Sequence, residues 1–337
     1  MEARTHERGS GRRSAPGGPG EPEAAPGAFG VAPAVAFLRG LREALDAGVD
    51  LPAAYARAAR SLPREARDAV SRAARRLEGD YSEDEWGFDE EFAEAVFPLF
   101  EFMYDRWWRV RAAGVENVPS HGRALLAANH AGIVPWDATM MGVALLRDHP
   151  LPRYPRFLVL NWAFDLPYVS FFMRKVGGVV ASPYNAQRLL EQDQLVAVFP
   201  EGVKGAGKPF RDRYRLQRFG RGGFVEIALR TGAPIVPVAV VGSEEIYPKL
   251  AEAPVLARLL RAPYFPLTPT FPWLGPLGAV PLPSKWRIEF CPPIETGSHG
   301  PDAANDRALV LELSERVKAA IQEKVYENLV KRGSAFV

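Results

Sequence analysis

The sequence predicts an α/β fold: a mostly parallel central sheet flanked by helices, with an N-terminal helical appendage. Short, Val-rich apolar segments alternate with helical segments between about residues 115 and 290. Strands that are covered on both faces are continuously apolar, and regular strand–helix alternation is typical of a parallel sheet. Residues 33–76 differ, because Ala, Leu and Arg recur there at helical spacing and indicate two or three amphipathic helices.

The boundaries of the expected elements follow from the same pattern. Strands are expected at residues 124–128, 157–160, 178–181, 195–199, 234–241 and 286–290. Helices are expected at residues 138–147, 185–194, 220–230, 244–260 and 302–331. Because ligand sites in parallel sheets form at the carboxyl ends of strands, the loops after the first and fourth strands are the first candidates for a functional site.

The chain is expected to divide into three regions. Its 337 residues are 47% hydrophobic, which is enough to bury a sizeable core. Residues 1–32 are rich in Gly, Pro, Arg and Glu and are expected to form a disordered tail. Residues 33–112 are expected to form a helical N-terminal region, and residues 113–337 the main domain.

Two apolar stretches each allow two interpretations. Residues 262–285 are rich in Pro, Phe, Leu and Gly, and they either fold over the core or contact an acyl chain or a bilayer. An aromatic stripe at helical spacing packs either against the core or at a bilayer interface. Its members are Phe97, Phe100, Tyr104, Trp107 and Trp108.

Composition excludes several classes of protein. The single cysteine, Cys291, rules out an intramolecular disulfide and a cysteine-based zinc cluster, and no metal-ligand spacing is found. A net charge of +2 without a recognisable motif gives no indication of a nucleic-acid partner. The sequence contains no run of about 18 apolar residues without a charge, so no transmembrane helix is expected. The first 30 residues lack the apolar core of a signal peptide. The expected location is therefore cytoplasmic.

A histidine stands where a catalytic base is expected. His130 closely follows the strand at 124–128, and Asp137 stands at the start of the next helix. A carboxylate that binds one imidazole nitrogen fixes the tautomer and stabilises the imidazolium when the other nitrogen takes a proton. Without a Ser or Cys nucleophile nearby, such a base would activate a hydroxyl or water. The alternative is a packed histidine beside a helix-capping aspartate.

A second candidate follows the strand at 195–199. Glu201 and Gly202 form a flexible acidic turn, and several basic residues follow. These basic residues form either a binding site for an anionic group or an exposed basic loop. These basic residues are Lys204, Lys208, Arg211, Arg213 and Arg215.

Residues 202–208 also match the spacing of a phosphate-binding P-loop. Pro209 follows them, where that motif needs Ser or Thr for Mg²⁺ and where a backbone N–H would face the phosphate. A nucleotide site of this kind is therefore excluded.

The motifs together, in their order along the chain, resemble the glycerolipid and lysophospholipid acyltransferase superfamily. The resemblance covers about residues 115–290, roughly half of the chain. The matching blocks are Asn129-His130 with Asp137, residues 177–182, residues 199–202 and residues 234–238.

The resemblance implies residue roles and co-substrates. His130 would be the general base and Asp137 its orienting partner. Glu201, Gly202, Lys204, Lys208 and Arg211 would bind the acceptor. Asn129, Gly178 and Pro237 would line the acyl or thioester pocket. No metal or bound cofactor is expected, and acyl-CoA or acyl carrier protein would serve as co-substrate.

Three departures from the family pattern concern the acceptor and the dyad. Six residues separate His130 from Asp137 where the family has four, so the loop must bulge outward. Ser182 stands where the family usually has an Arg that binds a phosphate, and the third block reads Glu-Gly-Val-Lys instead of Glu-Gly-Thr-Arg. These changes favour the branch that resembles mono- and diacylglycerol acyltransferases, whose acceptors are neutral.

The resulting hypothesis is an O-acyltransferase that moves a fatty acyl group from the thioester to a hydroxyl of a glycerolipid or lysophospholipid. It would work as a peripheral protein on the inner face of the membrane, with the lipid surface as its partner. One alternative is an enzyme specific for lysophosphatidate or lysophospholipids in phospholipid synthesis. The other is a non-catalytic lipid-binding protein at the membrane surface.

Overall fold

The computed structural model describes residues 31–60, 67, 83–132 and 134–336. The predicted tail at 1–32 therefore lies outside the described residues except for its last two positions. The chain forms two compact units, residues 1–74 and residues 75–337. The first unit contains two described helices, α1 (Val31–Asp46) and α2 (Leu51–Ala59), which confirm helical structure in this region. The carboxylate of Asp50 caps α2 by accepting the Ala53 N–H at 2.9 Å.

The second unit is built around a seven-stranded sheet of order β1-β9-β6-β2-β5-β3-β4. Strands β6, β2, β5, β3 and β4 pair in parallel, each with its neighbour in this order, and β1 pairs in parallel with β9. Strand β9 runs antiparallel to β6. The expected mostly parallel sheet is thus confirmed. The strands are β1 (Arg111–Ala113), β2 (Ala124–Ala128), β3 (Arg156–Val159), β4 (Gly178–Val180), β5 (Leu195–Val198), β6 (Ile235–Val241) and β9 (Arg287–Phe290).

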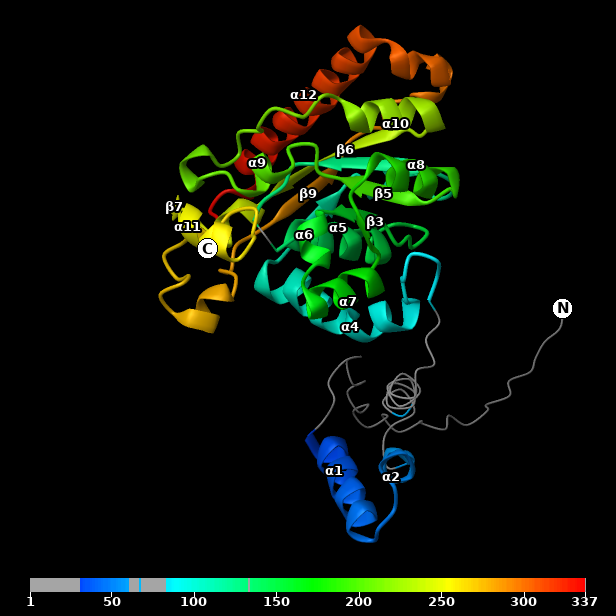
Figure 1. Ribbon diagram of the computed structural model, residues 1–337, viewed down its shortest axis with the longest axis vertical. Helices are drawn as coiled ribbons and strands as arrows, with labels where there is room; N and C mark the ends of the chain where they lie inside the picture. The colour runs from blue at the N-terminus through cyan, green and yellow to red at the C-terminus, as the bar shows by residue number, and fades with distance from the viewer. Residues whose placement is uncertain (1–30, 61–66, 68–82, 133, 337) are drawn as a thin grey trace, which may run out of the picture. The chain divides into compact units, whose positions relative to one another are not determined.

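Helices cover both faces of the sheet (Figure 1). One face carries α4 (Glu90–Phe102), α5 (Trp136–Arg147) and α7 (Pro167–Lys175), and the other carries α8 (Pro183–Glu191), α10 (Gly223–Thr231) and α12 (Arg307–Arg332). Each face has its own cluster of buried apolar side chains, because alternate residues of a strand point to opposite sides. Leu126 and Val236 belong to one cluster, and Leu125 and Ile235 to the other.

The aromatic stripe packs in the core of this unit. After α4 the chain continues as a π-helix, Met103–Trp107. Trp108 is fully buried and stacks on Trp286 with ring centroids 4.8 Å apart, and its indole N–H donates to the Leu282 carbonyl at 3.1 Å. Core packing, and not a bilayer contact, therefore explains Trp108. Since this segment packs with the sheet, the division between the compact units falls after Ala74 and not at the predicted boundary of 112 and 113.

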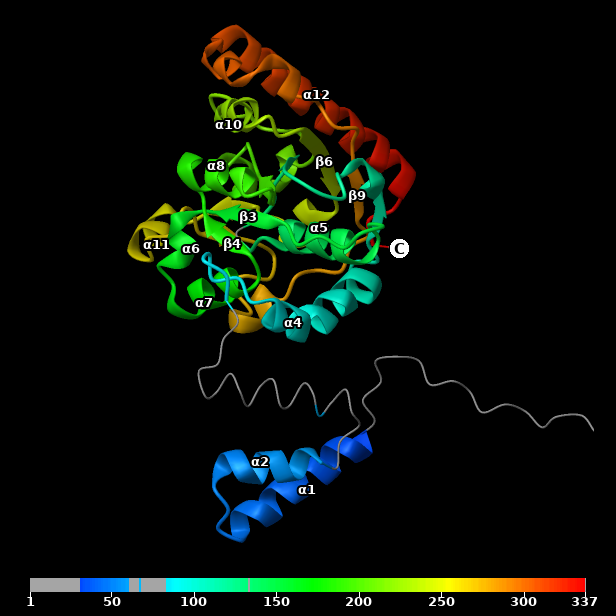
Figure 2. The same ribbon diagram turned by 90° about the vertical axis from the view of Figure 1, so that its right-hand side faces the viewer.

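The helix expected at residues 244–260 is wrong. The segment forms a 3-10 turn (Ser243–Glu245), a short strand β7 (Ala251–Glu252) and a short helix α11 (Pro254–Leu259). Pro248 and Pro254 interrupt any longer helix, because proline lacks the N–H that the helical ladder requires. Strand β7 instead pairs with β8 (Pro266–Leu267) in a separate two-stranded sheet. Helix α11 lies to one side of the main sheet (Figure 2).

Among the described residues, no helix is long and apolar enough to span a membrane. The longest apolar stretch, residues 157–173, is divided between β3, a short helix α6 (Asn161–Phe164) and α7.

Candidate active site

Three loops meet at the carboxyl edge of the parallel strands. Strand β2 is hydrogen-bonded to both β5 and β6, so the residues that follow these three strands emerge side by side. The loop after β2 carries His130, the loop after β5 carries Glu201, and the turn after β6 carries Ser243. The sequence placed the first two at this edge, and the topology confirms that position.

His130 and Asp137 are in direct contact. The Nδ1 atom of His130 lies 2.7 Å from Oδ2 of Asp137, and the Asp137 side chain is fully buried while that of His130 is 16% exposed. An ionised carboxylate only accepts hydrogen bonds, so Nδ1 carries the proton and Nε2 is the acceptor. The imidazole also stacks on Phe199, with ring centroids 4.3 Å apart. The side chain of His130 is thus fixed in orientation and in tautomer.

The longer loop between the two residues is accommodated without separating them. Gly132 adopts a left-handed conformation (φ 79°) and donates its N–H to the Ala206 carbonyl at 3.1 Å. Asp137 lies in the first turn of α5, where the helix dipole favours a negative charge, and it accepts the Ala131 and Ala138 N–H groups at 2.8 and 2.9 Å. The carboxylate therefore holds both the imidazole and the backbone of the loop.

Glu201 makes its contacts within the protein. It accepts the backbone N–H of His130 at 3.3 Å and that of Gln217 at 2.6 Å, and it is only 4% exposed. A side chain at Gly205 would come within 2.5 Å of the Glu201 Cβ, so the glycine allows this close approach. Glu201 therefore links the His130 loop to the basic loop, and its predicted role towards the acceptor stays a prediction.

The basic residues after Glu201 differ in their surroundings. Lys208 is buried, and its Nζ atom lies 2.9 Å from Glu244 and 3.4 Å from Glu201. Burial raises the pKa of Glu244, and Lys208 opposes that shift. The sequence suggested an acceptor contact for Lys208, but the structure places its charge between two carboxylates. Lys204 and Arg211, in contrast, are exposed.

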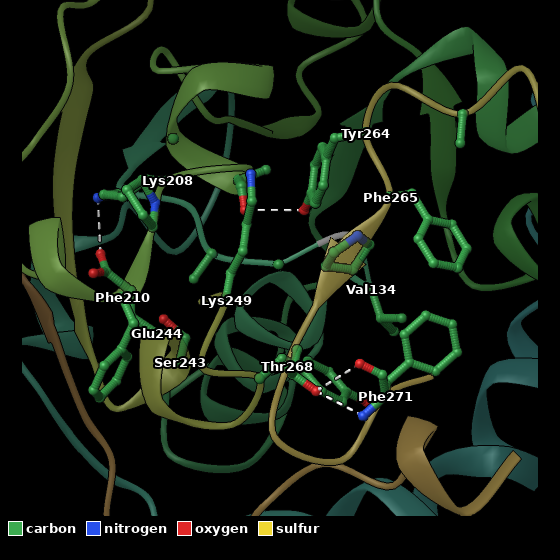
Figure 3. Close-up of a pocket in the computed structure, with 18 of the residues that line it drawn as sticks. Val134, Lys208, Phe210, Ser243, Glu244, Lys249, Tyr264, Phe265, Thr268 and Phe271 are labelled. Carbon is green, nitrogen blue, oxygen red and sulfur yellow. Dashed lines mark hydrogen bonds and ion pairs between the residues drawn. The ribbon is translucent and has the colours of Figure 1, made fainter. Parts of the chain in front are cut away.

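An apolar pocket of about 260 Å³ adjoins the His130 loop (Figure 3). Ala131 and Gly132 form part of its wall, together with Trp162 of α6, the loop after β5, the turn after β6 and residues between 260 and 279. Sequence reasoning missed Ser243 and Tyr247, and it gave Tyr264, Phe265 and Phe271 only as part of the apolar stretch 262–285. The apolar character of residues 262–285 was the available signal, and the structure shows that this segment folds over the pocket.

The three residues expected to line an acyl pocket do not line this one. The Asn129 amide is buried and makes two hydrogen bonds to the backbone of Val240, at 2.7 and 2.8 Å. Gly178 lies on the edge strand β4, where a Cβ would meet the Met173 carbonyl at 2.8 Å. Pro237 is in the middle of β6, opposite Ala127. These residues support the positions of the strands and loops that carry the site.

The loops that carry His130 and Glu201 lie in a region of the chain that matches a known family. A family model described as Acyltransferase matches residues 109–241, which include the His130 loop, the Glu201 loop and all of β6. The chain belongs to the acyltransferase family. The match ends before the segment that covers the pocket, so the pocket of this acyltransferase is completed by residues outside the family model.

Individual relatives extend the comparison. An uncharacterized protein of Mycobacterium tuberculosis is 52% identical over 262 residues, which cover 77% of this acyltransferase and 73% of that protein. Phytyl ester synthase 2 of Arabidopsis thaliana is 26% identical over 258 residues, covering 65% of this chain and 34% of the plant protein. A crystal structure of the 1-acyl-sn-glycerophosphate acyltransferase of Thermotoga maritima has a TM-score of 0.48 and 20% identity, and covers 73% of this chain and 84% of that one.

Proposed function

We propose that this acyltransferase transfers a fatty acyl group from acyl-CoA or acyl carrier protein to a lipid hydroxyl, with His130 as the general base. The acceptor is a glycerolipid or lysophospholipid, and an uncharged acceptor is favoured. The observation that carries the proposal is the contact between His130 and Asp137 at 2.7 Å, beside an apolar pocket. This arrangement leaves the Nε2 atom as a proton acceptor on a loop whose next two residues, Ala131 and Gly132, line the pocket.

The proposed reaction needs one base and no protein nucleophile. The acceptor oxygen attacks the thioester carbonyl carbon while its proton moves to Nε2 of His130, and Asp137 stabilises the imidazolium. The C–S bond then breaks, and the imidazolium returns the proton to the departing thiolate. General-base catalysis typically contributes about 10²–10⁴ in rate, and positioning of the thioester and the alcohol supplies much of the remainder.

Charge in the site supports an uncharged acceptor. Lys208 is already paired with two carboxylates, and Asp137 adds a third carboxylate nearby. Ser182, at the position where the family usually has a phosphate-binding Arg, caps α8 by accepting the Asn185 N–H at 3.0 Å. The name of the plant relative, a phytyl ester synthase, describes an ester of a neutral alcohol. A phosphate near this group of carboxylates would be repelled.

The alternative is an anionic acceptor bound at the rim of the site. Lys204 and Arg211 are exposed, and Arg213, whose guanidinium lies over the Phe210 ring, lines the pocket. Guanidinium groups bind phosphate in bidentate fashion, so these residues suit the headgroup of lysophosphatidate.

An acceptor panel tests the proposal. Purified protein receives labelled oleoyl-CoA with monoacylglycerol, diacylglycerol, a neutral lysolipid or lysophosphatidate, and each reaction is repeated with oleoyl-acyl carrier protein. We expect transfer to a neutral acceptor to be fastest and to change less than about threefold in Lys204→Ala and Arg211→Ala, because exposed charges contribute little. Preference for lysophosphatidate, with a large loss in these variants, would establish the anionic alternative. Lack of transfer with either donor would favour a non-catalytic lipid-binding role.

We further propose that the face formed by α11 and residues 273–280 contacts a lipid surface. Val255 and Leu259 on α11 are each 76% exposed, Trp273 is 70% exposed and Leu277 is 73% exposed. Arg258 and Arg261 lie in the same segment and suit anionic headgroups. The same segment forms part of the pocket wall, so a lipid could enter the pocket from this face.

Replacing Trp273 and Leu277 together with serine is expected to weaken binding to vesicles of phosphatidylcholine and phosphatidylglycerol by tenfold or more. Each side chain would lose about 1.5 kcal/mol of apolar burial, and about 1.4 kcal/mol corresponds to a factor of ten. Vesicle flotation provides the measurement. Val330→Ser is the matched control, because Val330 is 84% exposed on α12. Equal flotation of the double variant and the unchanged protein would refute this surface.

A further inference from the structure

One polar atom in the pocket has no partner. Ser243 is 2% exposed, lines the pocket, and its hydroxyl makes no hydrogen bond with any of the residues that the structure describes. A buried hydroxyl without a partner is unfavourable, and it is uncommon in folded proteins. The roles assigned above to His130, Asp137 and Glu201 leave this hydroxyl unexplained.

The backbone fixes Ser243 in this position. Gly242 has φ 114°, a backbone conformation that residues with a side chain rarely adopt, and a Cβ there would lie 2.5 Å from the Trp286 ring. The chain therefore turns sharply at the end of β6, directly before Ser243. On the other side, Glu244 is held by Lys208 at 2.9 Å and by the Tyr214 N–H at 2.6 Å. Both neighbours being fixed, the Ser243 hydroxyl has little freedom to find a partner elsewhere.

The pocket has a polar end and an apolar end (Figure 3). Ser243, Glu244 and Lys208 lie together at one end, and Phe265 and Phe271 lie at the other with ring centroids 5.4 Å apart. Glu244 and Lys208 are paired with each other, whereas the Ser243 hydroxyl at this end has no partner among the residues that the structure describes. Ligand pockets typically have apolar walls with a few placed polar groups that fix the orientation of the ligand.

We propose that this pocket binds an aliphatic chain whose uncharged oxygen group, a hydroxyl or a carbonyl, hydrogen-bonds to Ser243. The volume of about 260 Å³ exceeds the roughly 150 Å³ of an engineered apolar cavity that binds benzene. The pocket therefore accommodates part of a long chain. This inference rests on the proposed function, and both the acyl thioester and a neutral acceptor carry the required chemistry.

The test measures binding without turnover. Oleoyl-CoA, monooleoylglycerol and oleyl alcohol are titrated separately into the His130→Ala protein, with and without Ser243→Ala, and thermal melting is recorded for each protein without ligand. We expect Ser243→Ala to weaken binding of the occupant about fivefold, the effect of one neutral hydrogen bond. The same substitution should leave the melting temperature of the ligand-free protein unchanged or higher, because it removes an unpaired buried hydroxyl.

Thr296→Val is the matched control. The Thr296 hydroxyl is fully buried and lies within hydrogen-bond distance of the Ala228 and Ala233 carbonyl oxygens, at 3.1 and 2.8 Å, and it does not line the pocket. This variant should lower the melting temperature and leave the affinity for all three probes unchanged. Phe265→Ala, at the apolar end, should weaken the binding of every probe that enters the pocket.

The pattern of affinities identifies the occupant. A loss confined to oleoyl-CoA assigns the pocket to the donor chain, and a loss confined to monooleoylglycerol or oleyl alcohol assigns it to the acceptor. Unchanged affinity for all three probes in Ser243→Ala would overturn the proposal, whatever the melting temperature. Because binding is scored in protein that lacks His130, this result differs from failure of the proposed function, which would be absence of acyl transfer in the acceptor panel.

Discussion

Replacement of His130 with alanine is expected to lower kcat by about 10²–10⁴, because the acceptor hydroxyl would lose its general base. The base acts only in the transition state, so kcat and kcat/KM should fall by similar factors. His130→Asn is the sharper variant, since the asparagine amide can still donate to Asp137 but offers no basic nitrogen to the acceptor. Steady-state rates with oleoyl-CoA and the best acceptor provide the measurement.

His149 provides a matched control for this experiment. It is also buried, and its two ring nitrogens contact the Leu151 and Val118 carbonyls at 2.6 and 2.8 Å. His149→Ala should lower stability but retain kcat in the folded protein. If His130→Asn kept more than about a tenth of the wild-type kcat, a loss smaller than a general base normally contributes, His130 could not be that base.

Replacement of Lys208 with methionine is expected to reduce the free energy of unfolding by about 3–5 kcal/mol, because it leaves buried carboxylates without their counter-charge. The side chains of Lys208, Glu201 and Glu244 are 3%, 0% and 6% exposed. Adding Glu244→Gln should recover part of the loss. Urea denaturation provides the measurement, and Lys204→Met is the control: its exposed side chain should change stability by less than about 0.5 kcal/mol.

The deficit of Lys208→Met should depend on pH. Burial raises the pKa of Glu244 above its ordinary value of 4.5, and loss of Lys208 raises the pKa further. A carboxyl with a raised folded-state pKa contributes stability below its unfolded-state pKa and loses that contribution as pH rises towards the folded-state value. The variant should therefore be closest to wild type near pH 4.5 and most destabilised at neutral pH. A deficit that grew on acidification would contradict this assignment.

The strands were predictable because their residues are buried on both sides. All five residues of β2, Ala124–Ala128, are buried, and the sequence alone gives these bounds. The contact between His130 and Asp137 was foreseeable in the same way, since one follows a strand and the other begins a helix. The helix predicted at residues 244–260 was wrong because the apolar spacing suggested a helix, whereas the prolines and the pairing of β7 with β8 determine the structure.

The pocket and the ion pairs could not be predicted from local pattern. Lys208 meets Glu244 from 36 positions away, and the sequence around either residue is equally compatible with an exposed charge. Ser243 follows β6 after one glycine, but only the packing of residues 262–279 over it shows that its hydroxyl is enclosed. Gly178 and Pro237 belong to motif blocks, yet neither of them lines the pocket.

The position of β1 affects how the protein is made. In the part of the chain that the structure describes, residues 111–113 pair with β9 alone, at residues 287–289. During synthesis on the ribosome, this edge of the sheet must wait until most of the chain has been translated. Bringing together segments so distant in sequence is slow, and the waiting segment exposes unpaired strand edges and apolar surface to other nascent chains. Chaperone demand should therefore peak late in translation, just before β9 emerges.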